Sequence, residues 1–160
     1  MLLFRYLTRP KLVATTHLAV GAAVGLWGGR LAGWIVNPES DLTRVIIQAG
    51  TALVLAAGSH VILDAVPHND EIYKIYGRIP LLAVELPIIF TIIFSIAYLR
   101  NLNPIIIFFG LVGAAWSDVF STFGLATFLH ENFHSIHRVE MVGSIIVQLS
   151  IAIASLIFLF

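Results

Sequence analysis

Five long apolar runs occupy most of this 160-residue chain and constrain its fold more than any other feature. The runs are Leu12–Val36, Val45–Val66, Ile79–Leu99, Pro104–Leu129 and Met141–Phe160. A helix needs about 20 residues to cross roughly 30 Å of hydrocarbon, and each run has that length. Prolines at or near the ends of the runs indicate where helices begin or end. The chain is therefore predicted to be an all-α integral membrane bundle of about five transmembrane helices, with residues 1–160 forming a single domain.

The helix of the fourth run is also compatible with an earlier end, near Gly124, because the residues that follow are no longer uniformly apolar. From Leu125 to Ile136 apolar residues recur at helical intervals, and histidines and charged residues lie between them. That alternation is typical of a helix that lies in the membrane interface and does not cross the bilayer. A short interfacial helix is therefore expected in this segment.

The composition indicates that the chain lies in a membrane, and it argues against nucleic acid as a partner. Hydrophobic residues make up 59% of the chain and charged residues only 11%, whereas a soluble domain carries about 25% charged residues. Membrane lipid is thus the expected surroundings. The nine basic residues balance the nine acidic ones, which argues against nucleic acid as a partner. The chain has no cysteine, so disulfides and thiolate metal sites are excluded.

The basic residues suggest which way the bundle faces. We name the face that holds the N-terminus side A and the opposite face side B. With five crossings, side A also holds the loop 67–78 and the segment 129–140. Lysine and arginine are more numerous on side A, which makes it cytoplasmic by the positive-inside rule. We therefore expect a multi-pass protein of the plasma (inner) membrane with a cytoplasmic N-terminus.

The histidines, and the carboxylates that lie within spans, gather in one half of the predicted bundle. The side-A half holds His17, His60, His68, His130, His134, His137, Asp64, Asp70, Glu85 and Asp118. The side-B half offers Gln48, Thr51, Ser95 and Gln148, but no histidine or carboxylate within a span. Ionisable groups at membrane depth are costly and usually face a bundle interior with a partner. One-sided polar chemistry is therefore predicted.

The spacing of these residues favours a metal site. His60, Asp64 and His68 are four residues apart, which places them on one helix face. Histidine nitrogen with carboxylate oxygen is a ligand set of catalytic Zn²⁺, and manganese or iron would also accept it. The predicted metal ligands are His17, His60, Asp64, Asp118, His134 and His137. Asp64 or Glu85 is the expected general base.

Glycines in the first run predict how the helices pack. His17, Gly21, Gly25, Gly29 and Gly33 recur every four residues. Small residues at that interval let two membrane helices approach closely. The second run offers a smooth partner surface in Ala49, Ala52, Ala56 and Ala57. If these two helices pack together, His17 should lie beside His60.

Each feature also has a structural explanation. Histidines collect at membrane–water interfaces, where amphipathic side chains are favoured. Asp118 and Ser117 could form a hydrogen-bonded structural pair between helices. His60 and Asp64 are harder to explain without a function, because two ionisable groups one turn apart inside a span are costly.

Four short stretches carry the candidate residues: "THLAVGAAVG" around His17, "GSHVILDAVPH" from Gly58, "GAAWSDVF" around Asp118 and "FHSIHR" from Phe133. Together they resemble the membrane-bound metal-dependent hydrolases, small multi-span bacterial and archaeal proteins distantly similar to zinc-dependent phospholipase C. Those proteins place a His-x-x-x-Asp helix after the other motifs, whereas here it comes second. The resemblance implies that His17, His60, Asp64, Asp118, His134 and His137 belong to the metal site.

Three functions are compatible with these features. The first is a metal-dependent hydrolase, most simply with zinc, which acts on a lipid-borne ester or phosphoester at the cytoplasmic leaflet. The second is a metal-ion or proton transporter or channel, which would need polar groups through both membrane halves. The third is a non-catalytic membrane scaffold with interfacial histidines. The one-sided polarity favours the hydrolase.

Overall fold

The computed structural model describes residues 14–64, 78–122 and 141–159, with side chains at 15–63, 83–116 and 146–159. All regular structure in these ranges is helical. The helices are α2 (Ala14–Val36), α3 (Asp41–Asp64), α5 (Arg78–Leu99), α6 (Pro104–Thr122) and α8 (Met141–Leu159). The all-α prediction is confirmed for the described residues, and each helix lies on one of the five apolar runs. The expected interfacial helix lies outside the described residues.

Polar residues extend α3 beyond its apolar run. The helix begins at Asp41 and not at the predicted Val45. The Ser40 hydroxyl accepts a hydrogen bond from the backbone N–H of Thr43 at 3.1 Å, as an N-cap residue does. Asp41 places a negative charge in the first turn, where the helix dipole favours it. The start of α3 is therefore set by capping.

Asparagines end both helices that reach the side-B turns. Asn37 has a φ of 42° and Asn101 a φ of 51°, and asparagine tolerates this left-handed conformation after a helix. In the second turn the Asn103 side-chain oxygen accepts the backbone N–H of Ile105 at 2.9 Å. Pro104 then occupies the first position of α6, where its missing N–H is harmless. Both connections are therefore short.

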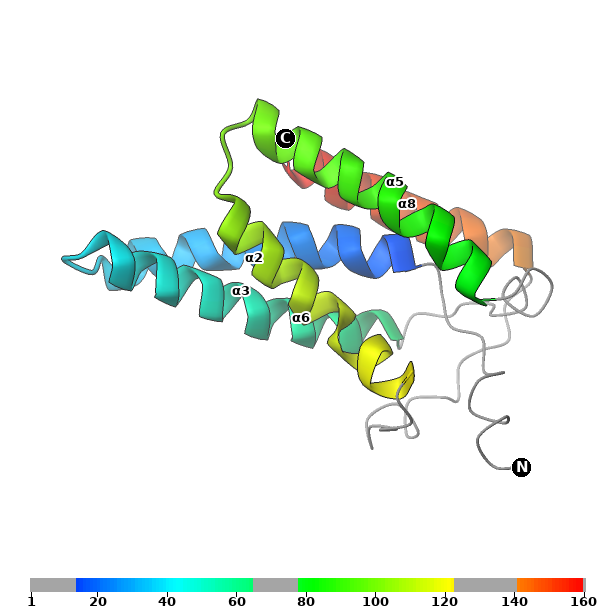
Figure 1. The fold of residues 1–160 in the computed structure, drawn as a ribbon, viewed down its shortest axis with the longest axis horizontal. Helices are drawn as coiled ribbons and strands as arrows, with labels where there is room; N and C mark the ends of the chain where they lie inside the picture. The colour runs from blue at the N-terminus through cyan, green and yellow to red at the C-terminus, as the bar shows by residue number, and fades with distance from the viewer. Residues whose placement is uncertain (1–13, 65–77, 123–140, 160) are drawn as a thin grey trace.

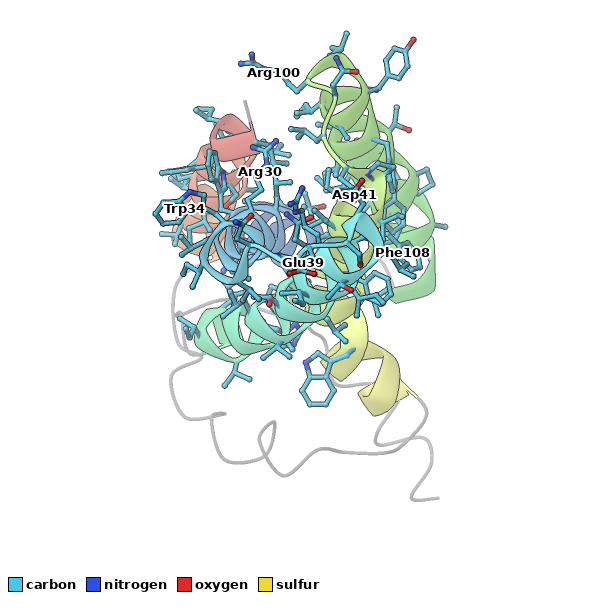
Figure 2. The ribbon with its side chains drawn as sticks, turned by 90° about the vertical axis from the view of Figure 1, so that its left-hand side faces the viewer. Arg30, Trp34, Glu39, Asp41, Arg100 and Phe108 are labelled. Atoms are coloured by element: carbon cyan, nitrogen blue, oxygen red, sulfur yellow. The ribbon has the colours of Figure 1, made fainter. Side chains whose placement is uncertain are left out.

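Helix α2 is the centre of the arrangement (Figures 1 and 2). It contacts α3, α6, α8 and α5, whereas α5 and α8 make few contacts with each other. Figure 1 shows α3 running back beside α2 after the turn at residues 37–40, and α6 crossing both. The starts of α2, α5 and α8 and the ends of α3 and α6 lie at the same end of the bundle, which is side A.

Glycines allow α2, α3 and α6 to approach closely. A Cβ atom at Gly25 would lie 2.8 Å from the Gly110 Cα and 3.4 Å from the Ala52 Cβ. One turn earlier, a Cβ at Gly21 would meet the side chain of Ala114. The predicted packing of the glycine stripe on the second apolar run is confirmed, and α6 shares the same surface.

Two of the described helices are long and apolar enough to cross a membrane. They are the segments Thr15–Val36 and Asp41–Leu63. In the other three helices, the apolar segments with described side chains are shorter, namely Ala83–Leu99, Pro104–Trp116 and Ile146–Leu159.

Candidate functional site

Two buried histidines meet near the side-A end of the bundle. His17 lies near the start of α2 and His60 near the end of α3, and they are only 3% and 1% exposed. Their Nδ1 atoms are 2.8 Å apart. The rings stand almost perpendicular, at 88°, with centroids separated by 4.2 Å. The predicted approach of His17 to His60 is thus confirmed.

A backbone carbonyl orients the second imidazole. The His60 Nδ1 lies 2.6 Å from the carbonyl oxygen of Ala114 in α6. Because a carbonyl only accepts, Nδ1 carries the proton in this hydrogen bond, and in the neutral imidazole Nε2 holds the lone pair. The Nδ1 of His17 then also accepts, since two N–H groups would repel each other at 2.8 Å. One proton is therefore shared between an oxygen and a nitrogen acceptor.

The two predicted aspartates lie one turn beyond this cluster. Asp64 is the last residue of α3, four positions after His60, and Asp118 follows Ala114 by four positions in α6. Residues four apart lie on the same side of a helix. The backbone therefore places both aspartates toward side A of the histidine pair. Their side chains are not described, so their ligand roles stay predictions.

Two further predicted ligands, His134 and His137, lie outside the described residues. Among the side chains that are described, no three histidine, aspartate or glutamate residues gather closely enough to hold a metal ion. Within those residues the structure brings together two members of the predicted set, His17 and His60.

Glu85, the other predicted base, lies on a different side of α2. The Thr15 hydroxyl donates a hydrogen bond to its Oε2 atom at 3.4 Å. Thr15 precedes His17 by two residues, which corresponds to roughly 200° around the helix axis. Glu85 is thus held by the face of α2 that points away from His60. Its role as a base stays a prediction.

Sequence reasoning missed Gln148 as a residue of this end of the bundle. It was assigned to the side-B half, although it lies only seven residues after Met141, where the run leaves side A. The Thr16 hydroxyl donates to its backbone carbonyl at 3.3 Å. Thr16 immediately precedes His17, so Gln148 belongs to the side-A half. Its side chain is 1% exposed. The signal was available, because a glutamine in a membrane run is a costly polar group.

The buried polar side chains of the described segments all belong to the side-A end. They are Thr16, His17, Ser59, His60 and Gln148. Ser59 is satisfied locally, because its hydroxyl donates to the Ala56 carbonyl at 2.8 Å. One-sided polarity is therefore confirmed for the described interior.

Comparisons of the chain with protein-family models, curated proteins and solved structures give no match. The functional assignment therefore depends on the residues of the site and on their geometry.

Proposed function

We propose that this chain is a membrane-embedded, metal-dependent hydrolase that acts on a lipid-borne ester or phosphoester at the cytoplasmic leaflet. The observation that carries the proposal is the histidine pair. Two imidazoles from separate helices meet in the buried interior, with their Nδ1 atoms 2.8 Å apart. Ionisable groups at membrane depth are rare and usually mark a functional site.

The outer surface supports placement in a membrane. Large apolar side chains are exposed on all five described helices, including Trp34, Val54, Ile88, Phe108 and Ile157. Soluble monomers rarely expose apolar surface on this scale. Figure 2 looks onto the side-B end, where Arg30, Glu39 and Asp41 lie around the end of α2 and the start of α3, and Arg100 lies apart from them near the end of α5. Trp34 and Phe108 point outward. The excess of basic residues on side A then favours a cytoplasmic N-terminus.

The donor set fits a divalent metal ion. A metal-binding histidine usually donates its other ring N–H to a carbonyl or carboxylate, and the Ala114 carbonyl holds the Nδ1–H of His60 in this way. In the neutral ring the Nε2 atom then has the lone pair, and it is buried. Because the Ala114 carbonyl occupies Nδ1, Nε2 is the atom of His60 that would bind the ion.

Each candidate residue has a defined task in this proposal. His17 and His60 would hold the ion, with Asp64, Asp118, His134 and His137 as the remaining predicted ligands. The bound metal would supply an activated water and polarise the scissile oxygen. Ala114 keeps the His60 ring in one orientation through its carbonyl. Asp64 or Glu85 would accept the proton of the attacking water.

The depth of the site suits a lipid substrate. His17 lies three residues from the start of α2 and His60 four residues from the end of α3. At 1.5 Å per residue these positions are about 5–6 Å inside the helix ends. An ester or phosphoester near a lipid headgroup would reach such a site from the leaflet.

The distribution of buried polar groups favours an enzyme over a transporter. A conduction path needs polar groups through both halves of the membrane. The buried polar side chains of the described helices are confined to the side-A end. A site that opens to one leaflet is the simpler arrangement.

Elemental analysis of the detergent-purified protein tests the proposal. We expect at least one zinc, manganese or iron ion per chain in the wild type, and loss of that metal in His60→Ala and Asp64→Ala. Gln48→Leu, a change on α3 toward side B, is the matched control and should keep the metal. A metal-free wild type, or full occupancy in His60→Ala, would contradict a site built on the histidine pair.

A further inference from the structure

A stripe of large side chains is exposed on the side-B half of α2. Trp27, Leu31 and Trp34 are 51%, 56% and 78% exposed, and Arg30 is exposed beside them. Residues three and four positions apart are neighbours on a helix surface, so these four lie on one face of α2. We name them the side-B stripe. Figure 2 shows Arg30 and Trp34 at this end of the molecule, with Trp34 pointing outward.

The end of α8 explains why the side-B stripe is uncovered. The Trp27 indole N–H donates to the Phe158 carbonyl of α8 at 2.8 Å, and the described part of α8 ends one residue later, at Leu159. Helix α2 continues to Val36, which lies roughly 13 Å beyond Trp27 at 1.5 Å per residue. The part of the stripe that follows Trp27 therefore extends past the helix that covers this side of α2.

The Arg30 guanidinium is positioned by an aromatic ring and has no acidic partner. Its Cζ atom lies 5.4 Å from the centroid of the Trp27 ring, within the range of a cation–π contact. Among the described residues, neither Glu39 nor Asp41 forms an ion pair with Arg30, and Asp41 is bound by Arg44 at 3.5 Å. The hydrogen bond to Phe158 holds the Trp27 ring, so the ring holds the cation with its N–H groups available.

The depth of Arg30 makes an uncompensated cation unfavourable. It precedes the end of α2 by six residues, which corresponds to about 9 Å along the helix axis. An arginine at membrane depth is costly unless its charged end reaches water or an anion. Extension to water is open to a long arginine side chain, but it would break the contact with Trp27. An anion that binds at the stripe satisfies the guanidinium in its present position.

The chemistry of the stripe selects the ligand class. A guanidinium is planar and donates two parallel hydrogen bonds to phosphate oxygens. Tryptophans are favoured at the level of the lipid headgroups, and Leu31 offers apolar contact to an acyl chain. A free phosphate ion would use Arg30 alone, whereas a phospholipid would use the whole stripe. The lipid is therefore the better match.

We propose that the side-B stripe binds the phosphate of a phospholipid in the side-B leaflet. Arg30 would donate to two phosphate oxygens, while the Trp27 ring keeps the guanidinium in place. The acyl chains would lie along Leu31 and the apolar surface of α2. This inference rests on the membrane placement in the proposed function and is independent of the metal.

Native mass spectrometry of the full chain in detergent tests this inference. The probe is dioleoylphosphatidylglycerol, and dioleoylglycerol is the control lipid, because it keeps both acyl chains but has no phosphate. Glycerol phosphate, which keeps the phosphate but has no acyl chain, is the soluble competitor. The test variant is Arg30→Gln. Arg100→Gln removes the same charge at the end of α5 and is the matched control. Metal content is measured on the same samples, so failure of the lipid site is distinguishable from failure of the metal site.

We expect the wild type and Arg100→Gln to retain the phospholipid at least about tenfold better than dioleoylglycerol, because hydrogen bonds to a charged group are strong. Arg30→Gln should lose about tenfold of this preference and keep its metal. Equal retention of both lipids by the wild type, or an unchanged preference in Arg30→Gln, would overturn the proposal. An equal loss in Arg100→Gln would show a general attraction to the positive end and would also overturn it. Displacement of the phospholipid by equimolar glycerol phosphate would show a free-phosphate site and contradict the lipid.

A second variant guards against misfolding. Arg30→Lys keeps the charge but cannot donate the paired hydrogen bonds of a guanidinium. It should fold and retain the phospholipid less well than the wild type and better than Arg30→Gln. If neither Arg30→Gln nor Arg30→Lys folds, Arg30 is a structural group and the lipid site is wrong.

Discussion

The proton on the His60 Nδ1 atom determines how the histidine pair behaves. Two acceptors face it, the Ala114 carbonyl at 2.6 Å and the His17 Nδ1 at 2.8 Å. The two imidazoles are therefore coupled, and neither is a separate core residue. Their coupling is a property of the protein itself and is measurable without metal.

A double-mutant cycle on the metal-free protein measures this coupling. His17→Leu and His60→Leu each leave one buried imidazole beside an apolar group, so each should lower the free energy of unfolding by about 1–3 kcal/mol. The double variant should lose less than the sum of the two, by about 0.5–3 kcal/mol. The measurement is denaturant unfolding in detergent micelles. Effects that add within about 0.5 kcal/mol would argue against a shared proton.

At the scale of the helices, close approach at glycine positions the site. A Cβ at Gly25 would press on the backbone of Gly110 in α6, and backbone cannot move aside as a flexible side chain does. The three helices that carry His17, His60 and Ala114 meet because of such contacts. Their packing therefore sets the distances of the histidine pair.

Two glycine-to-alanine changes separate this packing role from helix propensity. Gly25→Ala should destabilise the protein by about 1–3 kcal/mol because α2 and α6 must separate. Gly50→Ala in α3 meets no atom within 4 Å, so it should be neutral or stabilising by up to about 1 kcal/mol. Thermal unfolding of both purified variants checks the pair. Equal shifts of the two midpoints would contradict the role given to Gly25.

The apolar runs and their flanking prolines were enough to predict that the five described helices exist, because a long apolar run between prolines indicates a helix. The glycine spacing was enough to bring His17 to His60. The start of α3 at Asp41 was missed, since it depends on the Ser40 cap and not on hydropathy. Gln148 was placed in the wrong half, although its distance from Met141 already puts it nearer side A. Its contact with Thr16 of α2 depends on tertiary packing and was not predictable from local sequence.

At the scale of the whole molecule, the middle segments of the helices are apolar and the turns at the side-B end carry charges. The sequence has no charged residue in 45–63, 86–99, 104–116 or 146–159. The described side-B turns carry Glu39, Asp41, Arg44 and Arg100. This distribution matches a hydrocarbon layer bounded by water.

Two lysine substitutions in α3 test how deeply each part of this helix lies in the membrane. Val54 in the middle of α3 is 67% exposed and Leu42 at its start is 72% exposed. Val54→Lys should reduce membrane insertion, since lysine at a membrane centre is unfavourable by about 2.5–3.5 kcal/mol. Leu42→Lys should insert normally, because its ammonium reaches the interface. The readout is the fraction retained in membranes after alkaline carbonate extraction. Normal insertion of Val54→Lys would contradict the assigned depth.

Three consecutive residues of α2 hold hydrogen bonds to three different helices, with Thr15 bound to α5, Thr16 to α8 and His17 to α3. A shift of these three residues by one position would rotate them by about 100° about the helix axis and give each side chain the wrong neighbour. The three hydrogen bonds therefore fix the position of α2 relative to α3, α5 and α8. Inserting one alanine ahead of Leu18 would therefore break all three hydrogen bonds at once, even though no polar residue had been removed.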